Sequence, residues 1–532
     1  MVLGSPRADQ SSRPSALVGL AVAALRSGNV LQARQMLQDR LAQQPNDADA
    51  LVTLADMAAS ENAIEEATLL LQRAVAADSS PGSRLALIDH LRRYGSPALA
   101  LREIEQLPQD VRDQFEVRGM EAALTGALGM HDRQIDVYRA MVRQRPNGAG
   151  VWISFGNALK TVGRTAEAVK ALQRAIRLDC GFGEAYWTLA NFKSFRFSNR
   201  DIAQMHKALR GKLSSLDALH IHFALGKAHE DRLEYEQSFE HYSTANAIRA
   251  AGFQAEQTSM SALVDESIAA FTAEFFERNE GAGCPDEGPI FVVGLHRSGS
   301  TLIEQILASH PLVEGTTELG IMKLIRDRIT RSSGATPATA ITRLQRSDFR
   351  RVGEEYLERT RPFRNTERPY FVDKLPGNWI NLPLIRVALP NAHIVDARRH
   401  PMACGFSNFK QNYASGVGFS YSLAMIGTFY RDYWRFMRHF DAVQPGASCR
   451  MINEQVIEQP EAEIRRMLDE LKLPFDPSCL EFYKNDRAVR TPSAEQVRRP
   501  INREGVDVWK NYEPWLDDLK VALGPALNSW AD

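Results

Sequence analysis

The sequence predicts a superhelix of α-helical repeats followed by an α/β domain of the P-loop type with a mainly parallel sheet. Two patterns predict this fold class. Small and large apolar residues recur every 34 positions in the first half of the chain, and the second half opens with a strand, a glycine-rich loop and a helix in succession. At 532 residues the chain also exceeds the size of a single hydrophobic core, so at least two domains are expected.

Composition narrows the class of protein. Hydrophobic residues make up 44% of the chain and charged residues 24%, which are values typical of globular proteins. The formal net charge of -1 gives no sign of nucleic-acid binding, although one local basic pocket is compatible with it. The cysteines are scattered without a CxxC pair, so neither a disulfide framework nor a metal site is predicted.

No targeting or membrane segment is predicted either. The apolar run at 16–25 continues into an amphipathic pattern and has no cleavage pattern after it, which argues against a signal peptide. No stretch reaches the roughly 20 apolar residues that span a bilayer. We therefore expect a cytoplasmic protein without a membrane span.

The repeat period is clearest after Pro146. Apolar or small residues follow it at offsets that recur in other copies, namely Trp152, Phe155, Gly156 and Ala168. The next copy starts 34 residues later at Cys180, and an upstream copy starts at Pro45. This pattern resembles the tetratricopeptide repeat, a helix pair that stacks on its neighbours to form a superhelix with a concave groove.

The array is predicted over 15–272, after a flexible N-terminus at 1–14. The segment 80–144 fits the repeat frame poorly, and 199–216 is interpreted as an inserted helical segment. The repeated residues are expected to form the core, so any function of the array lies on its groove. A protein or peptide acceptor, another subunit and no partner at all are each compatible with such a groove, and the sequence does not predict an oligomeric state.

A cluster of turn-forming residues separates the two halves of the chain. It begins within the predicted linker at 273–285 and continues beyond it to Pro289. Beyond it, strand-like and helix-like segments alternate, which predicts an α/β domain over 286–532 with a largely parallel sheet.

A glycine loop follows the first strand of this domain. The apolar run 290–293 leads into 294–301, and an amphipathic helix comes next. Glycines let backbone N–H groups approach a phosphate, and the helix N-terminus adds partial positive charge. The loop residues expected to bind an anion are His296, Arg297, Ser298, Gly299, Ser300 and Thr301.

The loop differs from the nucleoside triphosphate P-loop at one position. Ser300 stands where that motif has its lysine, which argues against the alternative of a kinase or triphosphatase. The positive charge lies instead at Arg297. The loop resembles that of sulfotransferases, which use 3′-phosphoadenosine 5′-phosphosulfate (PAPS) and no metal, although these enzymes usually have proline where this chain has His296.

The resemblance extends to residues that would hold the 3′-phosphate of the donor. In sulfotransferases an arginine at the end of a strand and a serine eight residues later take this role, and Arg399 and Ser407 have that spacing. The adjacent Arg398 is interpreted as structural or surface. Near the C-terminus, Ser493 and Arg499 match the segment that closes over the donor in these enzymes.

Two further residues match positions with a chemical role in the family. Glu318 resembles the catalytic base of tyrosylprotein sulfotransferases, which accepts the proton of the acceptor hydroxyl. Lys374 resembles the lysine that meets the bridging oxygen of the donor, where it stabilises the charge on the departing phosphate. Arg297 is the third expected catalytic residue. The rival bases are three histidines: His296, His310 and His400.

Taken over the whole chain, the sequence resembles bacterial tetratricopeptide repeat-containing sulfotransferases, whose catalytic domain is similar to the tyrosylprotein branch. The resemblance implies transfer of a sulfuryl group to a hydroxyl, with protein tyrosine as the expected acceptor. Carbohydrate or small-molecule hydroxyls stay open as acceptors. A nucleotide-binding scaffold without catalysis is the alternative from another class, and His296 is the feature that favours it.

Overall fold

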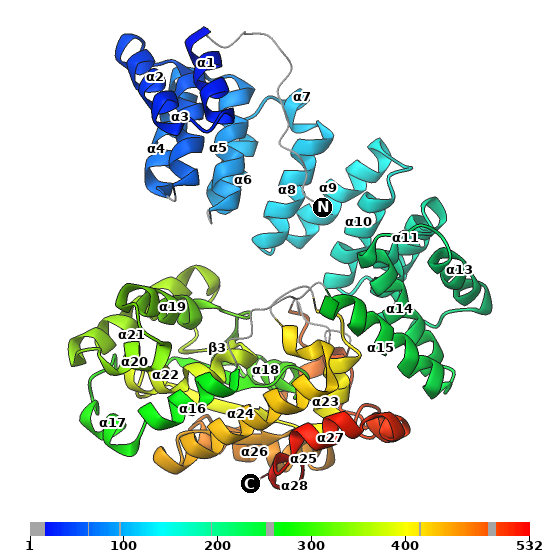
Figure 1. Cartoon of the computed structure of the whole chain (residues 1–532). Helices are drawn as coiled ribbons and strands as arrows, with labels where there is room; N and C mark the ends of the chain where they lie inside the picture. Colours follow the sequence, from blue (N-terminus) through cyan, green and yellow to red (C-terminus); the bar gives the residue numbers. More distant parts are fainter. Residues whose placement is uncertain are drawn as a thin grey trace. The chain divides into compact units, whose positions relative to one another are not determined.

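The computed structural model describes residues 16–61, 63–94, 97–192, 194–251, 260–413, 417–487 and 496–531. The chain divides into two compact units, Met1–Leu178 and Asp179–Asp532 (Figure 1). The predicted flexible N-terminus at 1–14 and the predicted donor residue Ser493 lie outside the described residues.

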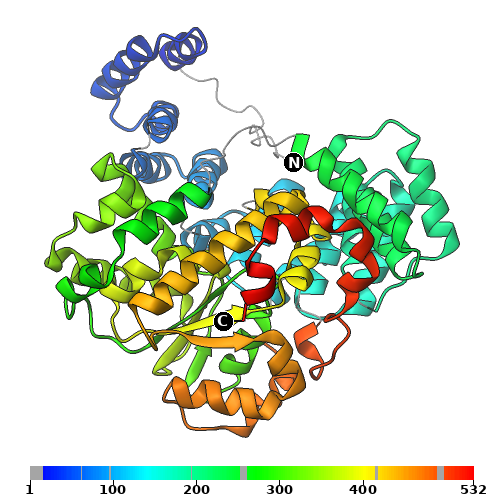
Figure 2. The same cartoon turned by 60° about the horizontal axis from the view of Figure 1, so that its bottom comes forward.

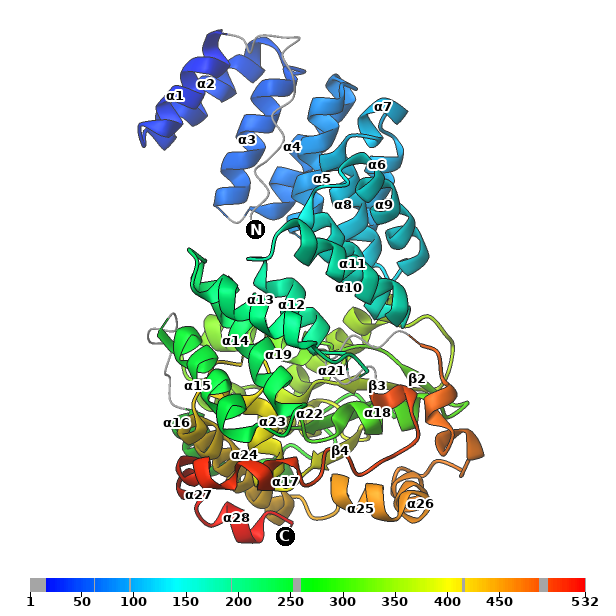
Figure 3. The ribbon, with the colours of Figure 1, turned by 90° about the vertical axis from the view of Figure 1, so that its right-hand side faces the viewer.

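The first unit consists of antiparallel helix pairs (Figure 3). Residues that recur with the repeat are buried in it: Leu51 and Ala55 on α3, and Ala67 on α4. Gly156 on α10 must be small, because a Cβ there would lie 2.8 Å from Leu172 Cγ on α11. The helices of this unit are α1 Ala16–Arg26, α2 Val30–Gln43, α3 Ala48–Ser60, α4 Ile64–Ala77, α5 Pro81–Arg93, α6 Pro97–Glu105, α7 Gln109–Arg112, α8 Phe115–Ala127, α9 His131–Gln144, α10 Ala149–Thr161 and α11 Thr165–Leu178.

The second unit begins with more helices of the repeat type. The segment interpreted from sequence as an insertion forms α13, which a Ser198 capping box starts. The helices that precede the sheet are α12 Gly183–Ala190, α13 Asn199–Leu209, α14 Ser215–Glu230, α15 Tyr235–Ala251, α16 Met260–Ala270 and α17 Ala273–Arg278. The predicted linker therefore starts with a short helix and falls inside this compact unit.

A five-stranded, all-parallel sheet forms the centre of the second unit, in the order β2-β3-β1-β4-β5. The connection after β1 leads to β2 at one edge of the sheet, and the connection after β4 leads to β5 at the opposite edge. The direction of the connections therefore reverses between the neighbouring strands β1 and β4. In parallel α/β sheets, ligands bind beyond the carboxyl ends of strands at such a reversal. The strands are β1 Pro289–Gly294, β2 Val313–Gly315, β3 Tyr370–Lys374, β4 His393–Arg398 and β5 Cys449–Ile452.

Helices cover both faces of the sheet, which explains why its strands are apolar without alternation. One face packs on α18, α25 and α26, and the other on α21, α22, α23 and α24. The last helices, red in Figure 2, pack against α24. These helices are α18 Ser300–Ala308, α19 Ile321–Ser333, α20 Pro337–Thr342, α21 Arg346–Thr360, α22 Leu382–Ala388, α23 Pro401–Phe409, α24 Leu423–Val443, α25 Asn453–Glu458, α26 Pro460–Glu470, α27 Asp517–Leu523 and α28 Ala526–Ser529.

Short 3₁₀ helices connect these elements: η1 Arg361–Phe363, η2 Pro376–Asn381, η3 Gly418–Tyr421, η4 Pro477–Cys479, η5 Phe482–Lys484, η6 Gln496–Arg498 and η7 Val508–Trp515. Tyr512 on η7 is fully buried, and its hydroxyl lies 2.8 Å from Ser238 Oγ on α15. Within the described parts of the chain, no helix combines the length and apolarity needed to cross a membrane.

The repeat-type helix α15 packs directly on the sheet domain. Asn246 donates a hydrogen bond of 2.8 Å to the backbone oxygen of Phe409, at the end of α23. Phe239 stacks on the Phe409 ring at 5.7 Å between centroids. One face of α15 thus shares a core with α23, the helix that carries the predicted donor residue Ser407.

Candidate active site

The glycine loop between β1 and α18 has the backbone that its sequence predicts. Gly294 and Gly299 have φ angles of 135° and 98°, in the region that only glycine adopts readily. Gly299 is the N-cap of α18, so the loop leads directly into the N-terminal end of this helix, which carries partial positive charge. Ser298 Oγ is buried and has no hydrogen-bond partner among the described residues. Such an arrangement suits an anion.

His296 occupies the place of the expected proline and packs like an apolar residue. Its ring centroid lies 5.5 Å from that of Tyr413 and 6.4 Å from that of Phe419. Its backbone oxygen accepts a hydrogen bond of 2.8 Å from Asn408 Nδ2 on α23. Burial lowers the pKa of His296 to about 4, so the ring is neutral at neutral pH. These contacts fix the loop by packing rather than by a restricted φ.

Arg297, Ser407 and Arg399 come together beside the loop from three segments of the chain. Arg297 has a φ of 68°, and its Nε donates a hydrogen bond of 2.9 Å to Ser407 Oγ. Arg399 follows the last residue of β4, and its Nη1 donates a hydrogen bond of 3.1 Å to the backbone oxygen of Arg297. The structure therefore brings together residues that are more than one hundred positions apart in sequence.

Arg399 has the environment expected of a group that meets an anion. Burial lowers its pKa, and the charge of Arg297 acts in the same direction. Its Nε has no hydrogen-bond partner among the described residues, and no carboxylate there lies within ion-pair distance of it. By contrast, Arg398 is fully buried and paired with Asp396 at 2.7 Å, so of the two interpretations, structural or surface, the structure favours the first.

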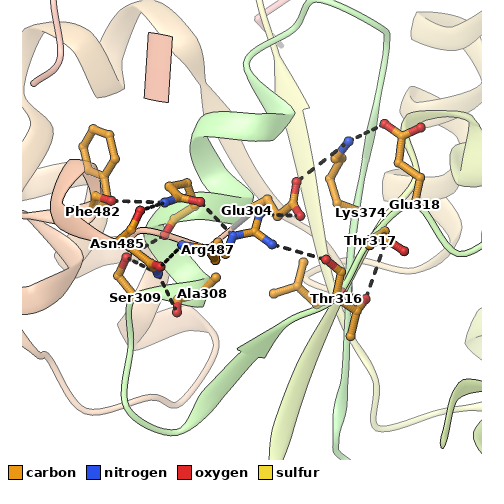
Figure 4. A network of polar contacts seen from close by, with 12 residues as sticks. Glu304, Ala308, Ser309, Thr316, Thr317, Glu318, Lys374, Phe482, Asn485 and Arg487 are labelled. Carbon is orange, nitrogen blue, oxygen red and sulfur yellow. Dashed lines mark hydrogen bonds and ion pairs between the residues drawn. The ribbon is translucent and has the colours of Figure 1, made fainter. Parts of the chain in front are cut away.

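Lys374 and Glu318 form an ion pair at the end of β3 (Figure 4). Lys374 is only 2% exposed, whereas Glu318 is 46% exposed. A second carboxylate, Glu304 on α18, lies 3.8 Å from Lys374 Nζ and is 5% exposed. The buried ammonium is thus balanced by one buried and one accessible carboxylate.

The sequence did not reveal the network that holds this pair in place. Arg487 pairs with Glu304 at 2.6 Å and donates hydrogen bonds to the side chain of Gln305 and the backbone oxygen of Thr316. Thr316 Oγ1 in turn donates to the backbone oxygen of Val372 on β3. Figure 4 shows these contacts joining α18, the loop before Glu318 and the segment after η5.

One sequence signal pointed to this network. Glu304 and Gln305 interrupt an apolar helix that is buried on nearly all sides, and charged residues are seldom buried unless they are paired. The partner Arg487 could not be found in the same way, because it lies in a polar segment far along the chain.

The other two histidines are held in structural positions. His310 is fully buried; its Nδ1 accepts from the N–H of Leu312 at 3.1 Å, so its Nε2 donates to the oxygen of Pro474 at 2.8 Å. His400 stacks on Trp509 with centroids 5.3 Å apart, and burial lowers its pKa. Both ring nitrogens of His310 are therefore occupied, which removes it as a base.

The closing segment is described only in part. Arg499 follows η6 and is exposed. Arg399 Nη2 also donates a hydrogen bond to the backbone oxygen of Gly505, which links the C-terminal segment to the end of β4. The predicted contact of Arg499 with a donor stays a prediction.

These features define a class of site: a P-loop-like glycine loop that suits an anion, at the carboxyl edge of a parallel sheet and without the lysine of nucleoside triphosphatases. Residues 289–477 match the family model of the sulfotransferase family, so the second unit contains a sulfotransferase family domain. The predicted order of a helical repeat region followed by an α/β domain with a parallel sheet is confirmed.

Relatives of known sequence or structure match parts of the chain. An uncharacterized protein from Aquifex aeolicus (strain VF5) is 34% identical over 303 residues, which is 55% of this chain. The chain spans 40% of the length of that curated relative. This chain covers a larger share of two solved structures. The sulfotransferase domain of the Synechococcus PCC 7002 olefin synthase is 22% identical, with a TM-score of 0.32, over 43% of this chain and 88% of that one. YrrB, a TPR protein with an unusual peptide-binding site, is 18% identical, with a TM-score of 0.29, over 32% and 90%.

Proposed function

We propose that the second unit transfers a sulfuryl group from PAPS to an acceptor hydroxyl. The observation that carries this proposal is the contact chain from Arg399 to Arg297 to Ser407, which gathers two guanidinium groups and a hydroxyl beside a glycine loop. A donor with two separate phosphate positions needs two sets of such groups. The family match over 289–477 supports the same chemistry.

The residues fit the donor on two counts. Gly299, Ser300 and Thr301 offer backbone N–H groups at the start of α18, and the buried Ser298 hydroxyl lies in the same loop. Arg399, with an unpartnered Nε, would bind the 3′-phosphate together with Ser407. When bound, the donor supplies the activated sulfuryl group. Ser493 and Arg499 complete the proposed donor site.

Glu318 and Lys374 would then share the chemistry. Glu318 accepts the proton of the acceptor hydroxyl while the bond from the acceptor oxygen to sulfur forms. Lys374 donates to the bridging oxygen, on which charge develops as its bond to sulfur breaks. Their ion pair supports this division, because a Lys374 that turns toward the oxygen releases Glu318 to accept the proton. Glu304, which also pairs with Arg487, stays near the buried ammonium meanwhile.

Protein tyrosine is the acceptor that we propose, held as part of a protein or peptide by the repeat groove. The superhelical array supports this, because stacked helix pairs create an extended concave surface. A sugar or small-molecule hydroxyl is the alternative. The proposal also includes a cytoplasmic location, which scattered cysteines without a paired spacing favour.

Ligand-dependent melting tests the donor. We expect 3′-phosphoadenosine 5′-phosphate to raise the melting temperature of the full chain and ATP to leave it unchanged, since a ligand at one hundred times its Kd adds about 2.7 kcal/mol. Equal stabilisation by both nucleotides would contradict a site built for the 3′-phosphate.

Kinetics of Glu318→Gln test the chemistry. The amide keeps the size of the side chain but removes the base, so kcat for transfer from labelled PAPS to tyrosine peptides should fall by roughly two to four powers of ten with donor affinity unchanged. Glu481→Gln, at an exposed glutamate after η4, is the matched control. Normal turnover in Glu318→Gln would show that this residue is not the base. Transfer to sugar hydroxyls but not to tyrosine peptides would contradict tyrosine as the acceptor.

A further inference from the structure

Four histidines that are not residues of the proposed donor site gather on three repeat-type helices of the second unit. His206 lies on α13, His222 and His229 on α14, and His241 on α15. One ring nitrogen from each of His206, His229 and His241 lies within 4.8 Å of the other two. The proposed transfer reaction uses none of these side chains.

The rings are close packed and only partly exposed. His229 and His241 stack with centroids 5.4 Å apart and planes 12° from parallel. The His206 centroid lies 5.5 Å from that of His241. Apolar packing alone does not require imidazoles from three helices to converge on one point.

Neighbouring groups orient the rings as they do in metal sites. His229 Nδ1 hydrogen-bonds to the Glu234 carboxylate at 2.6 Å, and its Nε2 is buried without a hydrogen-bond partner among the described residues. A carboxylate on the outer nitrogen fixes the tautomer and makes the inner nitrogen a stronger ligand. His241 Nδ1 lies 2.9 Å from His222 Nδ1, so Nε2 is the ring nitrogen of His241 that this contact does not use.

We propose that His206, His229 and His241 bind one divalent transition metal ion, for which Zn²⁺ is the best chemical match. Imidazole nitrogen suits zinc and its neighbours rather than magnesium or calcium. Zinc–nitrogen bonds of about 2.0–2.1 Å place tetrahedral ligand atoms about 3.4 Å apart. The three nitrogens lie within 4.8 Å of one another, so side-chain rotations would have to bring them to that spacing, and water would take the fourth position.

The sequence predicted no metal, because ligands on three separate helices leave no recognisable spacing.

The ion would fasten the inserted helix α13 to the pair α14–α15. That pair carries the contacts with the sheet domain: Glu230, next to His229, accepts from Lys410 at 3.0 Å, and Asn246 on α15 bonds to Phe409. The metal site would thus stiffen the support of α23, which carries Ser407.

Metal titration of the full chain, freed of any affinity tag, tests the proposal. After treatment with a chelator, we expect one Zn²⁺ per chain by calorimetry, a higher melting temperature with Zn²⁺, and visible absorption bands of tetrahedral Co²⁺ when cobalt is used. If the wild-type chain forms no one-to-one complex with Zn²⁺, the proposed site is wrong, regardless of the results for any variant.

Variants locate the ion. His229→Gln and His241→Gln should each lower Zn²⁺ affinity at least about tenfold, and Glu234→Gln about 10- to 100-fold, because an outer partner tunes the ligand. His220→Gln on the same helix α14 should bind Zn²⁺ as the wild type does. Unchanged affinity in the first two variants, or an equal loss in His220→Gln, would show that the imidazoles form a metal-free polar cluster.

Discussion

Lys374 depends on two carboxylates with different exposure, and this difference suggests different roles for them. Glu304 is buried in α18 and held by Arg487, so it cannot move away without leaving a charge in the core. Glu318 is nearly half exposed, and water can replace Lys374 as its partner. A fixed counter-ion and an exchangeable one are what a lysine needs if it is to change partners during a reaction.

Arg399→Ala should weaken binding of 3′-phosphoadenosine 5′-phosphate about ten- to a hundredfold, the loss expected for a charge-assisted hydrogen bond. Binding of adenosine 5′-monophosphate, which lacks the 3′ group, should change little. Calorimetry with both nucleotides measures the difference, and the exposed Arg503→Ala is the control. The same loss for both nucleotides would mean that Arg399 does not contact the 3′-phosphate.

Asp373, next to Lys374, should give the stability of the protein a pH dependence. Burial raises its pKa to about 7 from 3.8, and in this environment it accepts hydrogen bonds from Tyr356 and from the N–H of Leu319, beside Glu318. Between pH 4 and 7 the folded state holds the proton and the unfolded state does not, so the free energy of unfolding falls as pH rises.

Denaturant unfolding of the wild type and Asp373→Asn over this pH range measures the effect. The wild-type free energy of unfolding should decline by a few kcal/mol relative to that of the variant as the pH rises from 4 to 7. Parallel curves would show that Asp373 is ionised in the folded protein.

At the scale of elements, one buried amide joins α15 to the end of α23, beside their apolar contacts. Asn246→Ala removes the donor that satisfies the backbone oxygen of Phe409, and a buried acceptor left without a partner costs about 1–3 kcal/mol. Thr244→Ala on the same helix should change stability by less than about 0.5 kcal/mol, because its hydroxyl lies on the exposed side. Chemical unfolding measures the stability of both variants. Equal losses of stability would show that the hydrogen bond from Asn246 to Phe409 does not stabilise the protein.

At the scale of the whole molecule, the second unit starts at Asp179, well before the predicted linker. A fragment covering 179–532 should fold and keep its affinity for 3′-phosphoadenosine 5′-phosphate, because α14 and α15 stay on the core that they share with α23 and η7. A fragment starting at Ala273 should melt at a lower temperature, since it exposes the apolar surface that α15 covers. Calorimetry measures the melting temperatures of the two fragments. Equal values would show that the packing of α15 does not stabilise the sheet domain.

Local patterns in the chain predicted much of the fold and part of the site. Residues 290–301 predict strand, loop and helix because the preferences involved act over a few residues, and the repeat period is visible for the same reason. Arg399 and Ser407 were recognised by a spacing within one strand and helix. Glu304 carried a weak signal, as a charge in an apolar helix, and Arg487 carried none.

The sequence by itself determined the repeat period, the order of the helical region and the α/β domain, and the glycine loop, since these follow from neighbouring residues. Only the tertiary structure decided which distant side chains meet: Arg297 with Ser407, Lys374 with both Glu304 and Glu318, and His206 with His229 and His241. It also decided that the last repeat helices belong with the sheet domain. The physical reason is that charge pairing and burial depend on distance in space, which packing sets and which sequence separation does not record.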